Sequence, residues 1–155
     1  MIVNPVRIIE ATYDAVLPNR FDVHAAMVML VAIGLQESRF IHRKQIGGPA
    51  RGFWQFERGG GVKGVLLHPS TERYAGAVCL LRRVPAVAQT VYDALADDDL
   101  LACAFARLLL YTDPRPLPTT AEGGWDYYIA NWRPGKPHRQ TWDGFFTQAV
   151  TLATQ

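Results

Sequence analysis

Cysteine is scarce in this 155-residue chain, which contains only Cys79 and Cys103. Two cysteines are too few for a fold stabilised by several disulfides, and they do not have the spacing of a zinc site. Both fall in apolar segments, where a free cysteine behaves as a small hydrophobic residue. One disulfide between them is the alternative, but we predict two buried free thiols, and we expect no metal ion or other cofactor.

Charged residues are also few, at 19% of the chain, with a formal net charge of +2. This near balance does not indicate a nucleic-acid partner, and the high apolar content of 49% argues against a disordered chain. The basic residues nevertheless form two groups, which we interpret as solvated loops rather than as a cleft for an anionic polymer: Arg39, His42, Arg43, Lys44 and Arg51, and then Arg133, Lys136, His138 and Arg139.

The apolar run at residues 25–35 is too short to cross a membrane, because its 11 residues compare with about 20 in a spanning helix. The chain starts Met-Ile-Val-Asn-Pro, without the basic start and apolar run that form a signal peptide. We therefore expect a protein that is made in the cytoplasm and does not insert into a membrane.

Apolar residues recur at helical spacing along most of the chain. This spacing predicts helices over residues 5–17, 22–38, 70–83, 85–97, 100–111, 125–132 and 141–153. Asp22 is the predicted cap of the second helix, and Ser70 is that of the third. The glycine-rich segment 47–64 predicts a loop or a small β region, and the proline-rich residues 113–118 predict a rigid connection. The length suits one hydrophobic core, so the sequence predicts a single, mainly α domain over residues 1–155.

Glu37 is an ionisable residue at the end of an apolar helix. It lies one helical turn after Ile33 and two after Leu30, so it continues a stripe that is predicted to be buried. Loss of water and the negative end of the helix dipole both raise the pKa of such a carboxyl group, while Arg39 and Arg43 would oppose them. A glutamate that keeps its proton at neutral pH can act as a general acid. A solvated glutamate pointing outward is the alternative, and position alone favours it.

Two further segments place aromatic and amide side chains downstream of Glu37. The first is Gly-Phe-Trp-Gln at residues 52–55, where the glycine allows close backbone approach to a ligand and the other side chains suit a sugar. The second contains Tyr127, Tyr128 and Asn131 before a Pro-Gly turn. Taken singly, the aromatic residues of both segments are typical of a hydrophobic core.

Taken together and in this order, these segments resemble the motifs of the lytic transglycosylases of the lysozyme superfamily, in particular the phage-encoded members. That family has Glu-Ser, Gly-Leu-Met-Gln and Ala-Tyr-Asn motifs, which match Glu37-Ser38, residues 52–55 and Ile129-Ala130-Asn131 here. The resemblance is specific over residues 36–55 and extends to Asn131. In two departures, Trp54 replaces the methionine, and the tyrosine of the third motif is missing from its usual place.

The resemblance implies a lysozyme-like fold with Glu37 as the catalytic acid. The substrate it implies is the glycan strand of peptidoglycan, cut between N-acetylmuramic acid and N-acetylglucosamine to leave a 1,6-anhydro end. The glutamate protonates the leaving oxygen and later takes a proton from the C6 hydroxyl, while the substrate's N-acetyl group stabilises the cation. Ser38 would hold local geometry or orient the substrate, and Tyr127 or Tyr128 would replace the missing tyrosine. The implied substrate-binding residues are Ser38, Gly52, Phe53, Trp54, Gln55, Tyr127, Tyr128 and Asn131.

Two other functions stay open at this point. A hydrolytic muramidase, of the lysozyme or endolysin kind, needs a second carboxylate, for which the candidates are Glu57, Asp113, Glu122 and Asp126. A catalytically inactive virion protein would instead keep the fold to bind peptidoglycan. Without a signal peptide, the protein is expected to reach the periplasm or cell wall in a virion, at lysis or through a secretion machine, so virion or tail components are candidate partners.

Overall fold

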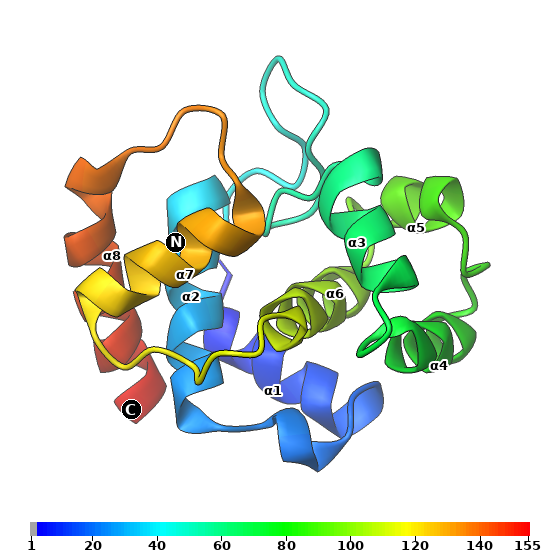
Figure 1. Ribbon diagram of the computed structural model, residues 1–155, viewed down its shortest axis with the longest axis horizontal. Helices are drawn as coiled ribbons and strands as arrows, with labels where there is room; N and C mark the ends of the chain where they lie inside the picture. The colour runs from blue at the N-terminus through cyan, green and yellow to red at the C-terminus, as the bar shows by residue number, and fades with distance from the viewer. Residues whose placement is uncertain (1–2) are drawn as a thin grey trace.

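The computed structural model describes residues 3–155, which form α-helices joined by loops, so the prediction of a mainly α chain is confirmed (Figure 1). Met1 and Ile2 lie outside the described residues, and they are the first two residues of the segment for which no signal peptide is predicted. Within residues 3–155, no helix has the length and apolar character needed to cross a membrane. The α-helices are α1 (Pro5–Ala15), α2 (His24–Ser38), α3 (Lys63–Leu67), α4 (Glu72–Arg82), α5 (Ala88–Ala94), α6 (Asp99–Thr112), α7 (Ala121–Trp132) and α8 (Arg139–Thr154).

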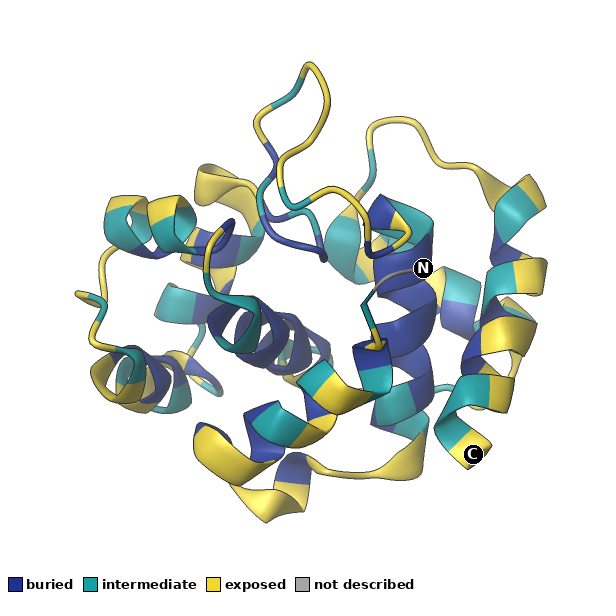
Figure 2. Ribbon diagram, turned by 180° about the vertical axis from the view of Figure 1, so that it is seen from behind, coloured by how far each residue is buried: buried dark blue, intermediate teal, exposed yellow. Residues whose placement is uncertain are grey.

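Helix α2 is surrounded by other helices. It packs most extensively against α8 and also contacts α1 and α6, while α3 and α4 pack against α6 (Figure 1). Residues 28–35 are all buried, and the middle of α2 is accordingly dark blue in Figure 2. A helix that is apolar on every side is stable in water only when its neighbours cover all of its faces. The prediction that this helix is central and buried is therefore confirmed.

The chain reverses direction directly after α2, and Gly34 makes this reversal possible. Arg39 and Phe40 have left-handed backbone conformations, with φ of 56° and 55°. The turn brings the Phe40 ring back against the helix, where a Cβ on Gly34 would lie 2.1 Å from the tip of the ring. Glycine is thus required by close packing, although inside a helix it costs about 1 kcal/mol relative to alanine.

Several helix starts differ from the prediction: α5 begins at Ala88 rather than at residue 85, α8 begins at Arg139 rather than at residue 141, and the other three involve caps. Asp22 lies one residue too early to cap α2, which follows Val23 and has no side-chain cap. Ser70 does not cap α4, because its hydroxyl lies 2.7 Å from Nδ1 of His68. Helix α7 begins one turn earlier than predicted, since the side chain of Thr120 accepts a hydrogen bond from the backbone N–H of the third residue of the helix at 3.1 Å. These helices were thus predicted correctly, whereas their capping residues were not.

The glycine-rich segment is more helical than predicted. An irregular helical turn, η2 (Arg58–Val62), leads directly into α3, and the buried side chains of Val62 and Val65 hold both against the core. Among the described residues, β structure is limited to isolated bridges that pair Arg51 with Lys44 and with Phe56. The predicted loop is therefore correct for residues 47–57, and the predicted small β region is reduced to single residue pairs.

Cys79 in α4 and Cys103 in α6 are buried and free, which confirms the preferred interpretation of the two cysteines. Burial raises the pKa of the Cys79 thiol to about 11 and that of Cys103 to about 12. Both side chains therefore remain protonated at neutral pH and act as small apolar groups in the core.

We predict that Gly34→Ala lowers the free energy of unfolding by about 1–3 kcal/mol, because the added methyl group overlaps the buried Phe40 ring. Gly76→Ala is the matched control, since Gly76 also lies inside a helix but a Cβ there meets no atom within 4 Å. The control should raise stability by up to about 1 kcal/mol through helix propensity. Urea unfolding followed by circular dichroism measures both values, and equal effects of the two substitutions would contradict the role of Gly34.

Candidate active site

Glu37 and Tyr128 form a hydrogen-bonded pair at the end of α2. The Tyr128 hydroxyl donates to Oε1 of Glu37 at 2.6 Å. Glu37 lies in the last turn of α2 and is half-buried, while Tyr128 comes from α7, which crosses in front of α2 in Figure 1. Two residues predicted for one site, from distant parts of the chain, are thus in direct contact.

Burial raises the pKa of Glu37 to about 7, and the hydrogen bond from Tyr128, a smaller effect, lowers it by stabilising the anion. No other charged group in the described part of the chain contributes to this change. The expected opposition from two arginines is therefore wrong: Arg39 is exposed, and Arg43 is paired with Asp99 at 2.8 Å. A carboxyl group with this pKa can both donate and accept a proton near neutral pH.

An aromatic cluster fixes Tyr128 beside Glu37. Its ring is stacked on that of Trp142, with centroids 5.2 Å apart and planes inclined by 8°, and it also contacts Trp125 and Trp132. Burial and the Glu37 carboxylate raise the pKa of Tyr128 far above its usual value, so the hydroxyl remains a donor. Sequence reasoning missed Trp132, although it lies one helical turn after Tyr128. It also missed Trp142, which no local spacing connects to Tyr128.

Ser38 joins the first predicted motif to the second. Its buried hydroxyl donates to the backbone oxygen of Phe53 at 2.7 Å and accepts from the backbone N–H of Phe40 at 3.1 Å. The end of α2 and residues 52–55 are therefore held together by a side chain that faces the core. Of the two predicted roles, the structure supports the maintenance of local geometry, because the hydroxyl is 4% exposed and does not face a ligand.

Phe53 and Trp54 belong to the core. Their side chains are 0% and 1% exposed, and the indole Nε1 of Trp54 donates to the backbone oxygen of Leu30 at 2.8 Å. The Phe53 ring packs against Phe40, with centroids 5.4 Å apart. The prediction that these two rings stack on a sugar is therefore wrong, because both are needed to cover α2 and its C-terminal turn.

Gly52 and Gln55 form the two ends of a tight turn. Gly52 has φ of 76°, and a Cβ there would lie 3.1 Å from Cβ of Ala102. The glycine therefore allows close approach to α6, whereas the prediction was close approach to a ligand. Gln55 has φ of 54°, and its side-chain Nε2 donates to the backbone oxygen of Gly52 at 2.8 Å. Its side-chain oxygen forms no hydrogen bond within residues 3–155 and remains available.

A groove of about 540 Å³ runs between the C-terminal end of α7 and the η2–α3 segment, with residues of α6 at its base. It adjoins a smaller cavity of about 60 Å³, and Gln55 is one of the residues that line this cavity. Trp132 lines both and contacts Tyr128, so it lies between the groove and the Glu37–Tyr128 pair. Glu37 itself is not part of either lining. The groove and the cavity share Glu57, Gly60, Gly61, Leu109, Asn131 and Trp132.

Asn131 is held in the groove by two hydrogen bonds, which its Nδ2 donates to Asp113 Oδ2 at 2.9 Å and to the backbone oxygen of Tyr127 at 2.8 Å. Both amide hydrogens are thereby used, which leaves Oδ1 as the atom that can contact a ligand. The Tyr127 hydroxyl donates to Leu110 O at 2.9 Å inside the core. Of the two candidate tyrosines, Tyr128 therefore contacts Glu37, and the prediction of a substrate contact for the hydroxyl of Tyr127 is wrong.

Unfavourable backbone conformations are concentrated around these residues. Among residues 3–155, five residues other than glycine have positive φ, and four of them adjoin the site: Arg39, Phe40, Gln55 and Arg133. Such conformations cost about 1–3 kcal/mol each and persist mainly where the surrounding structure imposes them, which is common at functional sites. Arg39 and Arg133 end α2 and α7, where this conformation is common, so the unusual positions beside the site are Phe40 and Gln55.

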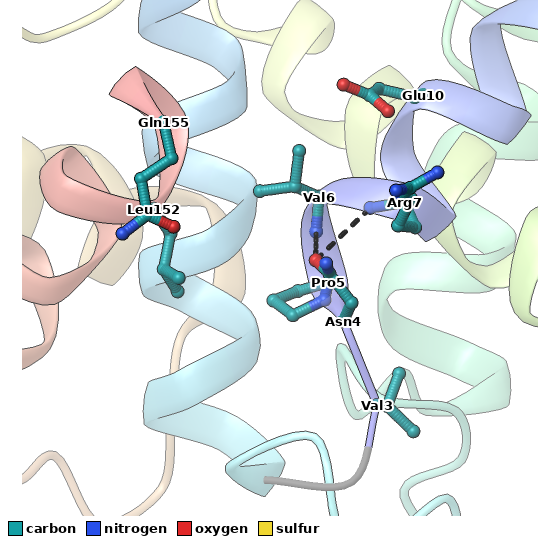
Figure 3. Close-up of a pocket in the computed structure, with 8 residues that line it drawn as sticks. All are labelled: Val3, Asn4, Pro5, Val6, Arg7, Glu10, Leu152 and Gln155. Atoms are coloured by element: carbon teal, nitrogen blue, oxygen red, sulfur yellow. Dashed lines mark hydrogen bonds between the residues drawn. The ribbon is translucent and has the colours of Figure 1, made fainter.

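A second hollow, of about 630 Å³, lies between the start of α1 and the end of α8 and offers no comparable chemistry (Figure 3). Its charged residues, Arg7 and Glu10, are exposed, and the side chain of Asn4 is used to cap α1. Elsewhere too, the described residues contain no group of three or more His, Cys, Asp or Glu side chains that could hold a metal ion. The chemistry is thus concentrated at Glu37 and the groove beside it.

Comparison of the chain with models of known protein families, with curated proteins and with solved structures finds no match. The assignment of a function therefore depends on the motifs and on the geometry of the site. The intervening ring of Trp132 connects Glu37 and Tyr128 to Asn131 in the groove and to Gln55 in the adjoining cavity.

We predict that Tyr128→Phe raises the pKa of Glu37 above its value of about 7, because the substitution removes the one hydrogen bond that the described residues donate to the anion. The measurement is the 13C chemical shift of the Glu37 carboxyl carbon as a function of pH. Tyr127→Phe is the control, since that hydroxyl is bonded to Leu110 and should leave the titration of Glu37 unchanged. A lower pKa in Tyr128→Phe would contradict the assigned role of the hydroxyl.

We also predict that Glu37→Gln stabilises the protein at alkaline pH. The folded-state pKa of about 7 exceeds the ordinary 4.5, so the folded chain holds the proton of Glu37 more tightly than the unfolded chain does. The free energy of unfolding is therefore highest below pH 4.5 and falls as the pH rises to 7. Glutamine does not ionise, so its advantage over glutamate should grow by roughly 3 kcal/mol between pH 4 and pH 8. Urea unfolding at both pH values, with the exposed Glu10→Gln as control, measures this difference.

Proposed function

We propose that this chain is a peptidoglycan-degrading enzyme of lysozyme-like fold, in which Glu37 is the only acid–base residue and the reaction is that of a lytic transglycosylase. The observation that most supports this proposal is the half-buried Glu37 carboxyl group, with its pKa of about 7 and its hydrogen bond from Tyr128. The motif resemblance supplies the substrate class. The enzyme would act on the cell wall, after transport in a virion or release at lysis.

The proposed reaction has two proton transfers, both through Glu37. Protonated Glu37 donates to the glycosidic oxygen, the bond from that oxygen to C1 of the muramic acid breaks, and the second sugar leaves as an alcohol. The N-acetyl group of the muramic acid stabilises the positive charge at C1. The C6 oxygen then bonds to C1 while its proton passes to Glu37, which restores the acid and closes the 1,6-anhydro ring without adding water. Between the two steps, the hydrogen bond from Tyr128 stabilises the carboxylate.

The groove supplies the sugar contacts in this proposal. The side-chain oxygens of Gln55 and Asn131 are free to accept hydrogen bonds from hydroxyl or N-acetyl groups. Trp132 is half-buried and has an aromatic surface suited to the apolar face of a sugar ring. Because Trp132 also contacts Tyr128, a sugar that binds against it would approach the Glu37–Tyr128 pair.

A hydrolytic muramidase is the second candidate, and one observation favours it. Glu57 lines the groove together with Asn131, so it is the carboxylate best situated to activate a water molecule. Asp113 is less suited, because it is bound by Arg115 at 2.6 Å and by Asn131. The other two candidates, Glu122 and Asp126, are exposed and line neither the groove nor the cavity.

We predict that Glu37→Gln reduces cleavage of purified sacculi by a factor of about 10² to 10⁴, since glutamine cannot transfer a proton. Mass spectrometry of the wild-type products should find 1,6-anhydro ends. Reducing ends, together with loss of activity in Glu57→Gln, would instead identify a muramidase. Equal cleavage by the wild type and a folded Glu37→Gln would contradict Glu37 as the acid, and no cleavage by the folded wild type would leave only a peptidoglycan-binding role.

A further inference from the structure

Arg107 is a buried cation without an acidic partner. It lies on α6 with 5% of its surface exposed, and its Nε donates to the backbone oxygen of Phe21 at 3.0 Å. Within residues 3–155, the two terminal amino groups of Arg107 form no hydrogen bond, and no carboxylate forms an ion pair with it. Burial of an unpaired charge is costly, so a buried arginine normally has an anionic partner.

The surroundings of Arg107 in the core do not supply that partner. Its guanidinium group lies over the ring of Phe21, 5.2 Å from the centroid. The buried hydroxyl of Tyr13 lies close enough to interact with the guanidinium group, although it forms no hydrogen bond of normal geometry among the described residues. Burial lowers the pKa of Arg107, as expected for a cation in an apolar environment. Tyr13 opposes this effect only in part and remains neutral, so the core supplies no compensating anion and such a partner would reach Arg107 from its accessible side.

On that side Arg107 opens onto a pocket of about 630 Å³. The pocket lies between α6, the proline-rich connection after it and the turn before α4, and its lining includes His68, Leu117 and Tyr127. His68 and Thr112 also line the groove described above, so the pocket and the groove adjoin. A ligand in the groove can thus extend into the pocket without leaving the protein surface.

The charges of the lining favour an anion with a single negative charge. Arg115 is paired with Asp113 at 2.6 Å, so these two residues neutralise each other. Arg107 is then the one uncompensated charge when His68 is neutral. The apolar side chains of Leu110 and Leu117 complete the lining and suit an aliphatic group attached to the anion. The planar fork of a guanidinium group matches the two oxygens of a carboxylate.

The hollow in Figure 3 provides a comparison. It has the same volume and also contains an arginine, Arg7, but that side chain is exposed and lies beside Glu10. A solvated arginine close to an acidic side chain gains little from a further anion. Burial and the lack of a partner therefore distinguish Arg107 from Arg7, whereas the size of the hollow does not.

We propose that the Arg107 pocket binds the carboxylate group of a short peptide, with the guanidinium of Arg107 as the group that recognises it. The pocket adjoins the groove that would hold the glycan, so its ligand would be a peptide attached to the glycan strand of peptidoglycan. This link to peptidoglycan rests on the proposed function, whereas the binding of a peptide carboxylate does not.

The first test compares two probes on the wild-type protein by 1H–15N NMR titration. N-acetyl-Ala-Ala with a free carboxylate should shift the signals of residues 68–70 and 107–117 and bind at least about tenfold more tightly than the same peptide with an amidated C-terminus. Inorganic phosphate should bind more weakly than the free acid. Equal binding of acid and amide, tighter binding of phosphate, or shifts confined to other regions would overturn the proposal.

The second test uses Arg107→Lys, which keeps the charge but removes the fork, with Arg7→Lys as the matched control. The first substitution should weaken binding of the free acid about tenfold, while the control should leave it unchanged. Unchanged binding in folded Arg107→Lys would overturn the proposal, and if this variant does not fold, the comparison of acid and amide on wild type decides. Binding is measured without catalysis, so a failure of the proposed function, seen with Glu37→Gln on sacculi, is distinguishable from a failure of this inference.

Discussion

The burial of α2 on every side is the constraint on which the rest of the structure depends. Other helices, together with Trp54, cover it to its last turn, and the indole of Trp54 donates a hydrogen bond to the backbone of α2 at Leu30. A carboxyl group at the end of such a helix loses much of its contact with water, and this loss raises its pKa. The chemical character of Glu37 is thus a consequence of how completely the helix before it is packed.

Tyr128 limits the cost of placing an acid in this environment. Its hydroxyl stabilises the Glu37 anion, and three tryptophans prevent its ring from turning away. Nevertheless, desolvation remains the larger effect on Glu37, so the folded chain is less stable with an ionised carboxylate than with a neutral group of the same shape. Stability alone therefore does not explain a glutamate at this position.

The periodic features of the molecule were predictable from sequence, whereas the orientation of single side chains was not. The helical spacing before Glu37 was sufficient to predict a buried helix, but by itself it favoured a solvated glutamate, and only together with the downstream motifs did it indicate a catalytic acid. The choice between Tyr127 and Tyr128 depends on the rotation of α7 about its axis, which packing against α8 determines and local spacing does not. Phe53 and Trp54 were predicted to bind sugar because their residue types suit both a core and a ligand, and only burial distinguishes the two.

The electrostatics of the carboxylates near the groove favour one acid over two. A retaining or inverting hydrolase needs a second carboxylate whose charge is free to act on the sugar or on water. Asp113 is bound by Arg115, and that interaction holds its pKa well below the usual range, so its charge is already compensated. Glu57 is exposed, and it makes no contribution to the titration of Glu37. The proposed reaction needs no second carboxylate, because the C6 hydroxyl of the substrate would return the proton that Glu37 gives up.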